Sequence, residues 1–156
     1  MATMRRLIAL AALALSLSCS PVAMFRYETS HKIRVYTESR SVSRSDVEAW
    51  TLEAYAIWLT LRPDWDRCIG QVMRHGLRVD LDFADAARVQ CRCGPDGSVI
   101  DVLGYTEPGL DMTLADSGYD MQILTHEIGH VLAYVCEGVW GEGSHQLFKR
   151  LGFPWM

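Results

Sequence analysis

The sequence predicts an α+β domain in which a mixed β-sheet is covered by helices. Two long segments place apolar residues at the spacing of an amphipathic helix, and three segments alternate apolar and polar residues as half-buried strands do. A chain of 156 residues is long enough to bury one core. We predict a signal peptide over residues 1–19 and a single domain over residues 20–156.

The first residues have the layout of a secretory signal peptide. Arg5 and Arg6 precede an apolar run over residues 7–17, and small and polar residues follow it. The run is shorter than the roughly 20 apolar residues of a membrane-spanning helix, and an N-terminal anchor that is never cleaved is the alternative. We therefore expect an exported protein, periplasmic or extracellular.

Residues 15–19 resemble the lipobox of bacterial lipoproteins, in which the cysteine is lipidated after cleavage. The lipobox has a branched residue three places before the cysteine and a small residue two places before it, whereas here Ser16 and Leu17 stand in swapped order. Lipidation of Cys19 would attach the protein to a membrane. Ordinary cleavage nearby would release it, and both outcomes stay open.

The first two elements of the domain are predicted to be a strand and a helix. Residues 32–38 alternate apolar and polar side chains and include β-branched residues. Ser45 and Glu48 have the spacing of a capping box, and apolar residues at helical spacing follow. The helix over residues 46–61 should end before Pro63. Its two tryptophans are expected in the core.

Three more strands are predicted between the two long helices. The alternation of residues 77–83 is the clearest strand signal in the sequence, and residues 98–105 and 110–114 are expected to form further strands. Residues 84–98 are expected to form a loop, because they contain the turn sequence Gly-Pro-Asp-Gly.

The second long helix is predicted over residues 119–136. A glycine-rich turn follows it, and Ser144 is expected to cap a short last helix that buries Leu147, Phe148 and Leu151. The apolar stripe of the long helix consists of four residues at helical spacing: Leu124, Ile128, Val131 and Val135.

The cysteine count indicates two disulfides. Without Cys19 four cysteines remain, an even number in a chain that we expect to be exported. Cys91 and Cys93 would lie about 7 Å apart on one face of an extended segment, too far to pair with each other. We therefore expect each of them to pair with Cys68 or Cys136. A metal-binding Cys-x-Cys pair is the alternative.

The charge of the chain argues against nucleic acid as a partner. Of 15 basic residues, two lie in the predicted signal peptide, which leaves 13 against 19 acidic residues and a net charge of −6. No basic run is present that could follow a phosphate backbone. We expect a monomer that binds no nucleic acid.

Residues 126–130, His-Glu-Ile-Gly-His, predict a metal site on the second long helix. His126 and His130 lie one helical turn apart on the same face, so both imidazoles can reach one metal ion at about 2.0–2.1 Å. Glu127 projects about 100° round the helix, beside the metal, where it can take a proton from zinc-activated water. The alternative is a surface helix with two incidental histidines.

A catalytic zinc ion needs a third protein ligand. We favour His145, because the glycine-rich turn before it can bring the chain back over the helix. Glu142 is the second candidate, since some zinc sites use a carboxylate, and Cys136, six residues after His130, is the third. Glu137 would lie about 10 Å beyond His130 along the helix axis, out of reach of the same metal unless the helix ends early.

The metal-site helix resembles the active-site helix of zincin metallopeptidases, and of matrixin-like metzincins in particular, over residues 125–132. Residues 109–116 are similar to the edge strand that precedes this helix in those enzymes and pairs with an extended peptide substrate. The likeness spans roughly residues 32–136. The chain lacks three metzincin features: Ala133 replaces a glycine, Cys136 replaces the third histidine, and no Met-turn is recognisable.

The resemblance implies a zincin-like fold, in which the sheet is packed by a backing helix and an active-site helix, and a zinc-dependent metallopeptidase activity. His126, His130 and His145 would bind Zn²⁺, and Glu127 would be the general base for zinc-activated water that hydrolyses a peptide or protein substrate. Candidates for stabilising the oxyanion are Tyr105, Tyr119 and Tyr134.

Two other functions stay open. One is a non-enzymatic exported lipoprotein or binding module that keeps a zincin-like fold, which the uncertain third ligand favours. The other is a metal-dependent hydrolase of a non-peptide bond. An open groove beside residues 110–114 would favour a peptide substrate, and a closed pocket would favour a small one.

Overall fold

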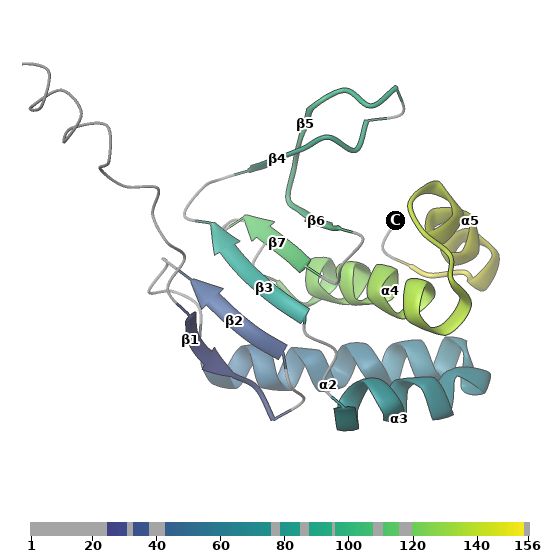
Figure 1. The fold of residues 1–156 in the computed structure, drawn as a ribbon. Coiled ribbons are helices and arrows are strands. Elements are labelled where there is room, and N and C mark those ends of the chain that lie inside the picture. The colour runs from purple at the N-terminus through teal and green to yellow at the C-terminus, as the bar shows by residue number, and fades with distance from the viewer. Residues whose placement is uncertain are drawn as a thin grey trace, which may run out of the picture.

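The computed structural model describes most of the chain between residues 25 and 154. The described ranges are 25–30, 33–37, 43–75, 79–84, 88–94, 96–107, 111–115 and 120–154. They form an α+β fold, which confirms the predicted class (Figure 1). The predicted signal peptide and Cys19 lie outside these ranges. None of the helices within them is long and apolar enough to cross a membrane.

A mixed sheet of five strands frames the domain. In order across the sheet, its strands are β1 (Phe25–Glu28), β2 (Ile33–Thr37), β3 (Val79–Ala84), β7 (Asp111–Ala115) and β6 (Gly104–Thr106). The three central strands run parallel, and the two outer strands run antiparallel to their neighbours. Strand alternation places Ile33 and Val35 of β2, and Met112 and Leu114 of β7, in the core.

The edge of the sheet next to the predicted active-site helix is β6. The expectation that residues 109–116 contain the edge strand is wrong, because the strand they contain, β7, lies between β3 and β6. The segment predicted as one strand over residues 98–105 bends at Leu103, so that its second half turns back along β7. Its first half, β5 (Ile100–Val102), pairs with β4 (Val89–Cys91) in a separate sheet. The segment predicted to be a loop therefore contains a strand.

Both predicted long helices are present. The helices are α2 (Arg44–Leu61), α3 (Asp66–His75), α4 (Met121–Glu137) and α5 (Glu142–Leu151), and a 3-10 turn, η1 (Pro63–Trp65), joins α2 to α3. Helix α3 and strand β1 have no counterpart in the sequence prediction. Figure 1 shows α4 lying between α2 and the small β4–β5 sheet.

The predicted capping box of α2 is wrong. The helix begins at Arg44, and its N-cap, Ser43, makes no side-chain cap hydrogen bond. The Glu48 carboxylate instead accepts hydrogen bonds from the backbone N–H and the hydroxyl of Ser30, each at 2.7 Å. A longer-range contact to the segment between β1 and β2 thus replaces the local one.

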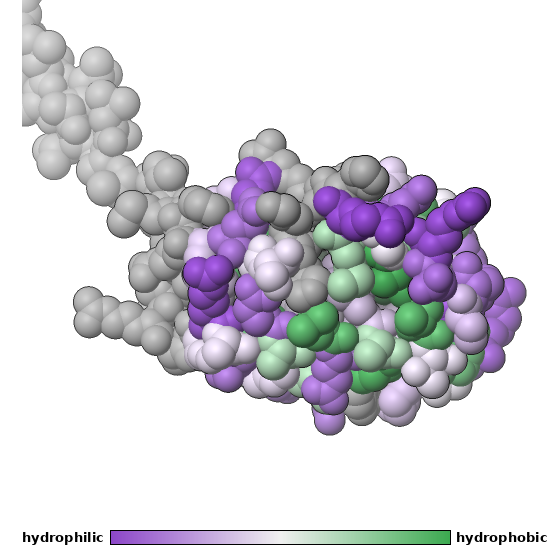
Figure 2. Space-filling model, turned by 90° about the horizontal axis from the view of Figure 1, so that it is seen from below, coloured by the Kyte–Doolittle hydropathy of each residue, from purple (hydrophilic) through white to green (hydrophobic). Residues whose placement is uncertain are grey.

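One hydrophobic core joins the sheet to α2, α3 and α4. Trp58 of α2 is fully buried and Trp50 packs against the core, as expected for the tryptophans. The predicted stripe of α4 is buried except for Val135, which is 36% exposed near the end of the helix. On the face seen from below, over α2 and α3, hydrophobic residues lie among hydrophilic ones (Figure 2).

The disulfides differ from the expected pairing. Cys68 of α3 is bonded to Cys136 of α4, with Cα atoms 5.7 Å apart, and Cys91 is bonded to Cys93, with Cα atoms 5.2 Å apart. The expectation that Cys91 and Cys93 each pair elsewhere assumed an extended segment. The chain bends at Arg92, directly after β4, which brings the two residues closer together.

Candidate metal centre

Helix α4 carries two of the three histidines of the site. The Asp120 side chain caps its first turn by accepting a hydrogen bond from Ile123 N–H at 2.9 Å. Trp58 of α2 donates from Nε1 to the carbonyl oxygen of Thr125 at 2.8 Å. These contacts hold the start of the helix, directly before His126 and Glu127, the first two residues of the His-Glu-x-x-His motif.

Gly129, inside the His-Glu-x-x-His motif, lets α2 and α4 approach each other closely. A Cβ atom at this position would overlap the ring of Trp58 and lie 3.0 Å from the ring of Phe148. The missing side chain therefore leaves room for Trp58 against the helix backbone. His126 and His130 lie about 60° and about 100° round the helix from Gly129, and both line the cavity between α4, α5 and β6.

Glycines reverse the chain after α4, as the sequence predicts. Gly138 ends the helix in the left-handed conformation with a φ of 69°, and Gly141 precedes α5 with a φ of 59°. Ser144 does not cap α5, because the helix begins two residues earlier, at Glu142. The Ser144 hydroxyl is buried and donates to the carbonyl oxygen of Val139 at 3.3 Å.

Phe148 anchors α5 to the core and thereby places His145. Its ring is fully buried, with its centroid 4.8 Å from that of Trp58. Phe153, after the helix, stacks on Trp58 at 4.6 Å. The prediction that Leu147 and Phe148 are buried is confirmed, whereas Leu151 is only partly buried against the core. With this face of α5 fixed, His145 lies over α4.

The three predicted histidines meet in one cluster. One ring nitrogen from each of His126, His130 and His145 lies within 4.8 Å of the others. The Nε2 atoms of His126 and His130 are 3.1 Å apart. Ring centroids of His145 lie 5.4 Å from His126 and 4.8 Å from His130. These three residues could hold one metal ion.

The cluster fits a metal that prefers nitrogen ligands. Nitrogens about 2.0–2.1 Å from a tetrahedral zinc ion are separated by roughly 3.3 Å, close to the spacing between His126 and His130. Burial first, and then the two neighbouring imidazoles, lower the pKa of His130 to about 3. His130 is therefore neutral at pH 7, which is the form that binds metals.

The other predicted ligand candidates stand outside the cluster. The Glu142 side chain is 73% exposed; its carboxylate lies 3.9 Å from Nδ1 of His145 and accepts a hydrogen bond from Gln146. Cys136 is bonded to Cys68 and offers no free thiolate. Glu137 accepts a hydrogen bond from Trp65 and pairs with Arg62 at the far end of α4.

Glu127 is buried beside the histidine cluster. The residue is 5% exposed, and burial raises the pKa of its carboxyl to about 7, against the opposing effect of a hydrogen bond from Thr106. The Thr106 hydroxyl, on β6, lies 2.7 Å from Oε2 of Glu127. Sequence reasoning missed Thr106, because no spacing rule relates residues 21 positions apart on a strand and a helix.

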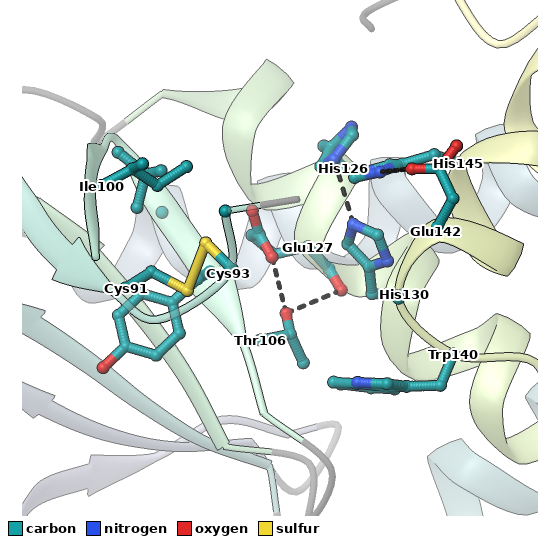
Figure 3. A pocket seen from close by; sticks show the side chains of 15 residues that line it. Cys91, Cys93, Ile100, Thr106, His126, Glu127, His130, Trp140, Glu142 and His145 are labelled. Atoms are coloured by element: carbon teal, nitrogen blue, oxygen red, sulfur yellow. Dashed lines mark hydrogen bonds and ion pairs between the residues drawn. A yellow bond between two sulfur atoms is a disulfide. The ribbon is translucent and has the colours of Figure 1, made fainter. Parts of the chain in front are cut away.

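The three histidines, Glu127 and Thr106 all line one cavity of about 640 Å³ (Figure 3). Its walls come from the β4–β5 sheet and β6 on one side and from α4 and α5 on the other. Apart from the site residues, Ile100, Val102 and Trp140 are among the lining. The cavity lies beside β6, and no described residue of 110–114, where an open groove would favour a peptide substrate, is among its lining. Its size falls in the ordinary range of about 300–1,000 Å³ for ligand sites.

The three tyrosines considered for the oxyanion have different positions. Tyr105 lines the cavity, beside Thr106 on β6. Tyr134 is 41% exposed, with its ring against Trp140 at 5.6 Å. Tyr119 lies outside the described residues. Of the two described tyrosines, Tyr105 is the one that lines the cavity.

Comparison of the chain with protein-family models, with curated proteins and with solved structures gives no match in any of the three.

Proposed function

We propose that this protein is a zinc-dependent metallopeptidase, with His126, His130 and His145 as zinc ligands and Glu127 as general base. The observation that carries the proposal is the arrangement of one cavity, in which three imidazoles converge beside a buried carboxylate. Three histidine ligands leave a coordination position open, as catalytic zinc sites require, whereas structural sites use four protein ligands.

Zinc is the metal that the donor set supports best. Imidazole nitrogens suit zinc and neighbouring transition metals, and the cluster includes no carboxylate of the kind that calcium and magnesium prefer. Zinc bound at this position would lower the pKa of a coordinated water toward 7 and polarise the scissile carbonyl.

Glu127 suits the role of general base. Its pKa of about 7 lies near physiological pH, where a group both accepts and returns a proton efficiently. The carboxylate would take a proton from the attacking water and deliver it to the leaving amine. Because the residue is buried beside the histidines, few bulk water molecules compete for that proton.

A peptide is the substrate class that the sheet edge supports. Strand β6 pairs with β7 on one side and, within the described residues, with no strand on the other. An extended peptide could add to this edge through main-chain hydrogen bonds, and such pairing recurs in peptide recognition. We also propose that the protein is exported, which the two disulfides support.

The test combines metal analysis with Glu127→Gln. We expect one zinc ion per chain in both the wild type and the variant, because Glu127 is not a ligand. We expect the wild type to hydrolyse quenched fluorescent peptides and the variant to hydrolyse them at least about 100-fold more slowly, because an amide cannot accept the proton. Full activity in Glu127→Gln would remove the assigned base. Zinc without peptide hydrolysis would favour a non-enzymatic binding module.

A further inference from the structure

We propose that Thr106 is a positioning residue for the general base: its hydroxyl holds one oxygen of the Glu127 carboxylate and leaves the other free to face the attacking water. This inference rests on the proposed function and adds a residue to it. It starts from a contact between β6, at the edge of the sheet, and α4 (Figure 3).

The hydroxyl of Thr106 makes one strong interaction. Its oxygen lies 2.7 Å from Oε2 of Glu127 and 3.3 Å from the backbone carbonyl oxygen of the same residue. A hydroxyl has a single proton to donate, and the shorter contact to a charged acceptor is the stronger one. Thr106 therefore donates to Oε2.

The contact distinguishes the two oxygens of the carboxylate. Oε2 is engaged by Thr106, so Oε1 is the oxygen available to take a proton. A carboxylate on a flexible glutamate side chain would otherwise sample several orientations inside the cavity. Fixing one oxygen removes that freedom, which is the kind of preorganisation that a general base needs for an aligned proton transfer.

The strand holds Thr106 without help from the side-chain hydroxyl. Thr106 pairs with Met112 of β7, and the next residue, Glu107, donates its backbone N–H to the carbonyl oxygen of Asp111 at 2.8 Å. Main-chain bonds thus set the position of this part of β6. The hydroxyl is left to act on Glu127, and replacing it with a methyl group preserves the β-branched shape that strands favour.

The link also connects substrate binding to the base. In the proposed function an extended peptide pairs with the outer edge of β6, and Thr106 is part of that strand. The same strand would then align the scissile bond through its backbone and the Glu127 carboxylate through a side chain.

The experiment compares Thr106→Val, which removes the hydroxyl, with Thr106→Ser, which keeps it. In Thr106→Val we expect kcat to fall about 10- to 100-fold, the value of a hydrogen bond to a charged group, while KM changes less than about threefold. Zinc content and melting temperature should remain those of the wild type. Thr106→Ser should restore kcat to within about threefold. Thr60→Val, an exposed threonine of α2 bonded to the carbonyl oxygen of Ala56, is the matched control and should change nothing.

Crystal structures of the zinc-loaded wild type and Thr106→Val provide a readout independent of activity. We expect one orientation of the Glu127 carboxylate in the wild type and a rotated or divided one in the variant. An unchanged carboxylate, or an unchanged kcat, would overturn the role of Thr106. Loss of zinc or of folding in both Thr106 variants would also overturn it, in favour of a structural role. A wild type that binds zinc but cleaves no peptide contradicts the proposed function, and the two structures still decide the role of Thr106.

Discussion

At the scale of the residue, His145 closes the candidate metal site. It is the one histidine of the cluster that α4 does not supply, and its ring centroid lies 4.8 Å from that of His130. Two imidazoles alone make a weak site, because each ligand contributes to affinity and fixes the geometry of the others. The nearby carboxylate of Glu142 is largely exposed and outside the cluster.

We predict that His145→Ala lowers zinc affinity at least about 100-fold, whereas Glu142→Ala changes it less than about fivefold. Competition titrations with a chromogenic chelator would measure both. Circular dichroism would establish that each variant keeps the wild-type helix content. If Glu142→Ala loses zinc and His145→Ala keeps it, Glu142 is the third ligand and the assignment of His145 is wrong.

Individual residues also differ in how well the sequence predicts them. His126, Glu127 and His130 follow from helical geometry alone, because positions i and i+4 share a face. The glycines between the two helices predict that the chain returns His145 over α4, and Gly138 and Gly141 adopt the positive φ that such a turn requires. Thr106 had no local signal, since its contact joins two elements whose packing only the whole fold determines.

At the scale of the element, the close packing of α2 on α4 depends on Gly129. Trp58 fills the space where a side chain would lie, and its ring is held on other sides by Trp65, Phe148 and Phe153. The ring is fully buried and has little room to move. An added methyl group must therefore push the two helices apart.

We predict that Gly129→Ala destabilises the protein by about 1–3 kcal/mol, although alanine favours a helix over glycine by about 1 kcal/mol. Overpacking against Trp58 outweighs the gain in helix propensity. Urea unfolding monitored by tryptophan fluorescence would measure the change, with Gln122→Ala on the exposed side of α4 as a control. A variant as stable as the wild type would show that α2 and α4 can separate at no cost.

The elements that the sequence failed to predict have physical explanations. Helix α3 is short and contains Gly70, although Ile69, Val72 and Met73 do have helical spacing. Strand β1 has only four residues, too few for a periodic pattern. The break at Leu103 turned one expected strand into two, and this moved the sheet edge from β7 to β6. Strand order depends on such turns, which hydrophobic alternation does not report.

At the scale of the whole molecule, the two disulfides differ in the length of the chain segment that each closes into a loop. The bond between Cys68 and Cys136 spans a sequence separation of 68 residues, which includes β3 to β7 and most of α4, and both cysteines pack against the core. The bond between Cys91 and Cys93 spans a separation of two residues in the wall of the cavity. Restricting the unfolded chain costs more entropy for a longer loop.

Chain entropy predicts that the long-range disulfide stabilises the fold by about 4 kcal/mol and the short one by about 1.5 kcal/mol. We therefore expect the double variant Cys68→Ala/Cys136→Ala to unfold at a clearly lower urea concentration than Cys91→Ser/Cys93→Ser. Linear extrapolation of both curves gives the free energies of unfolding. Because the long-range bond ties α3 to the C-terminal end of α4, its loss should also loosen the helix that carries His126 and His130. Equal losses of stability in the two variants would contradict the loop-entropy argument and indicate that the short bond holds the cavity wall to the rest of the fold.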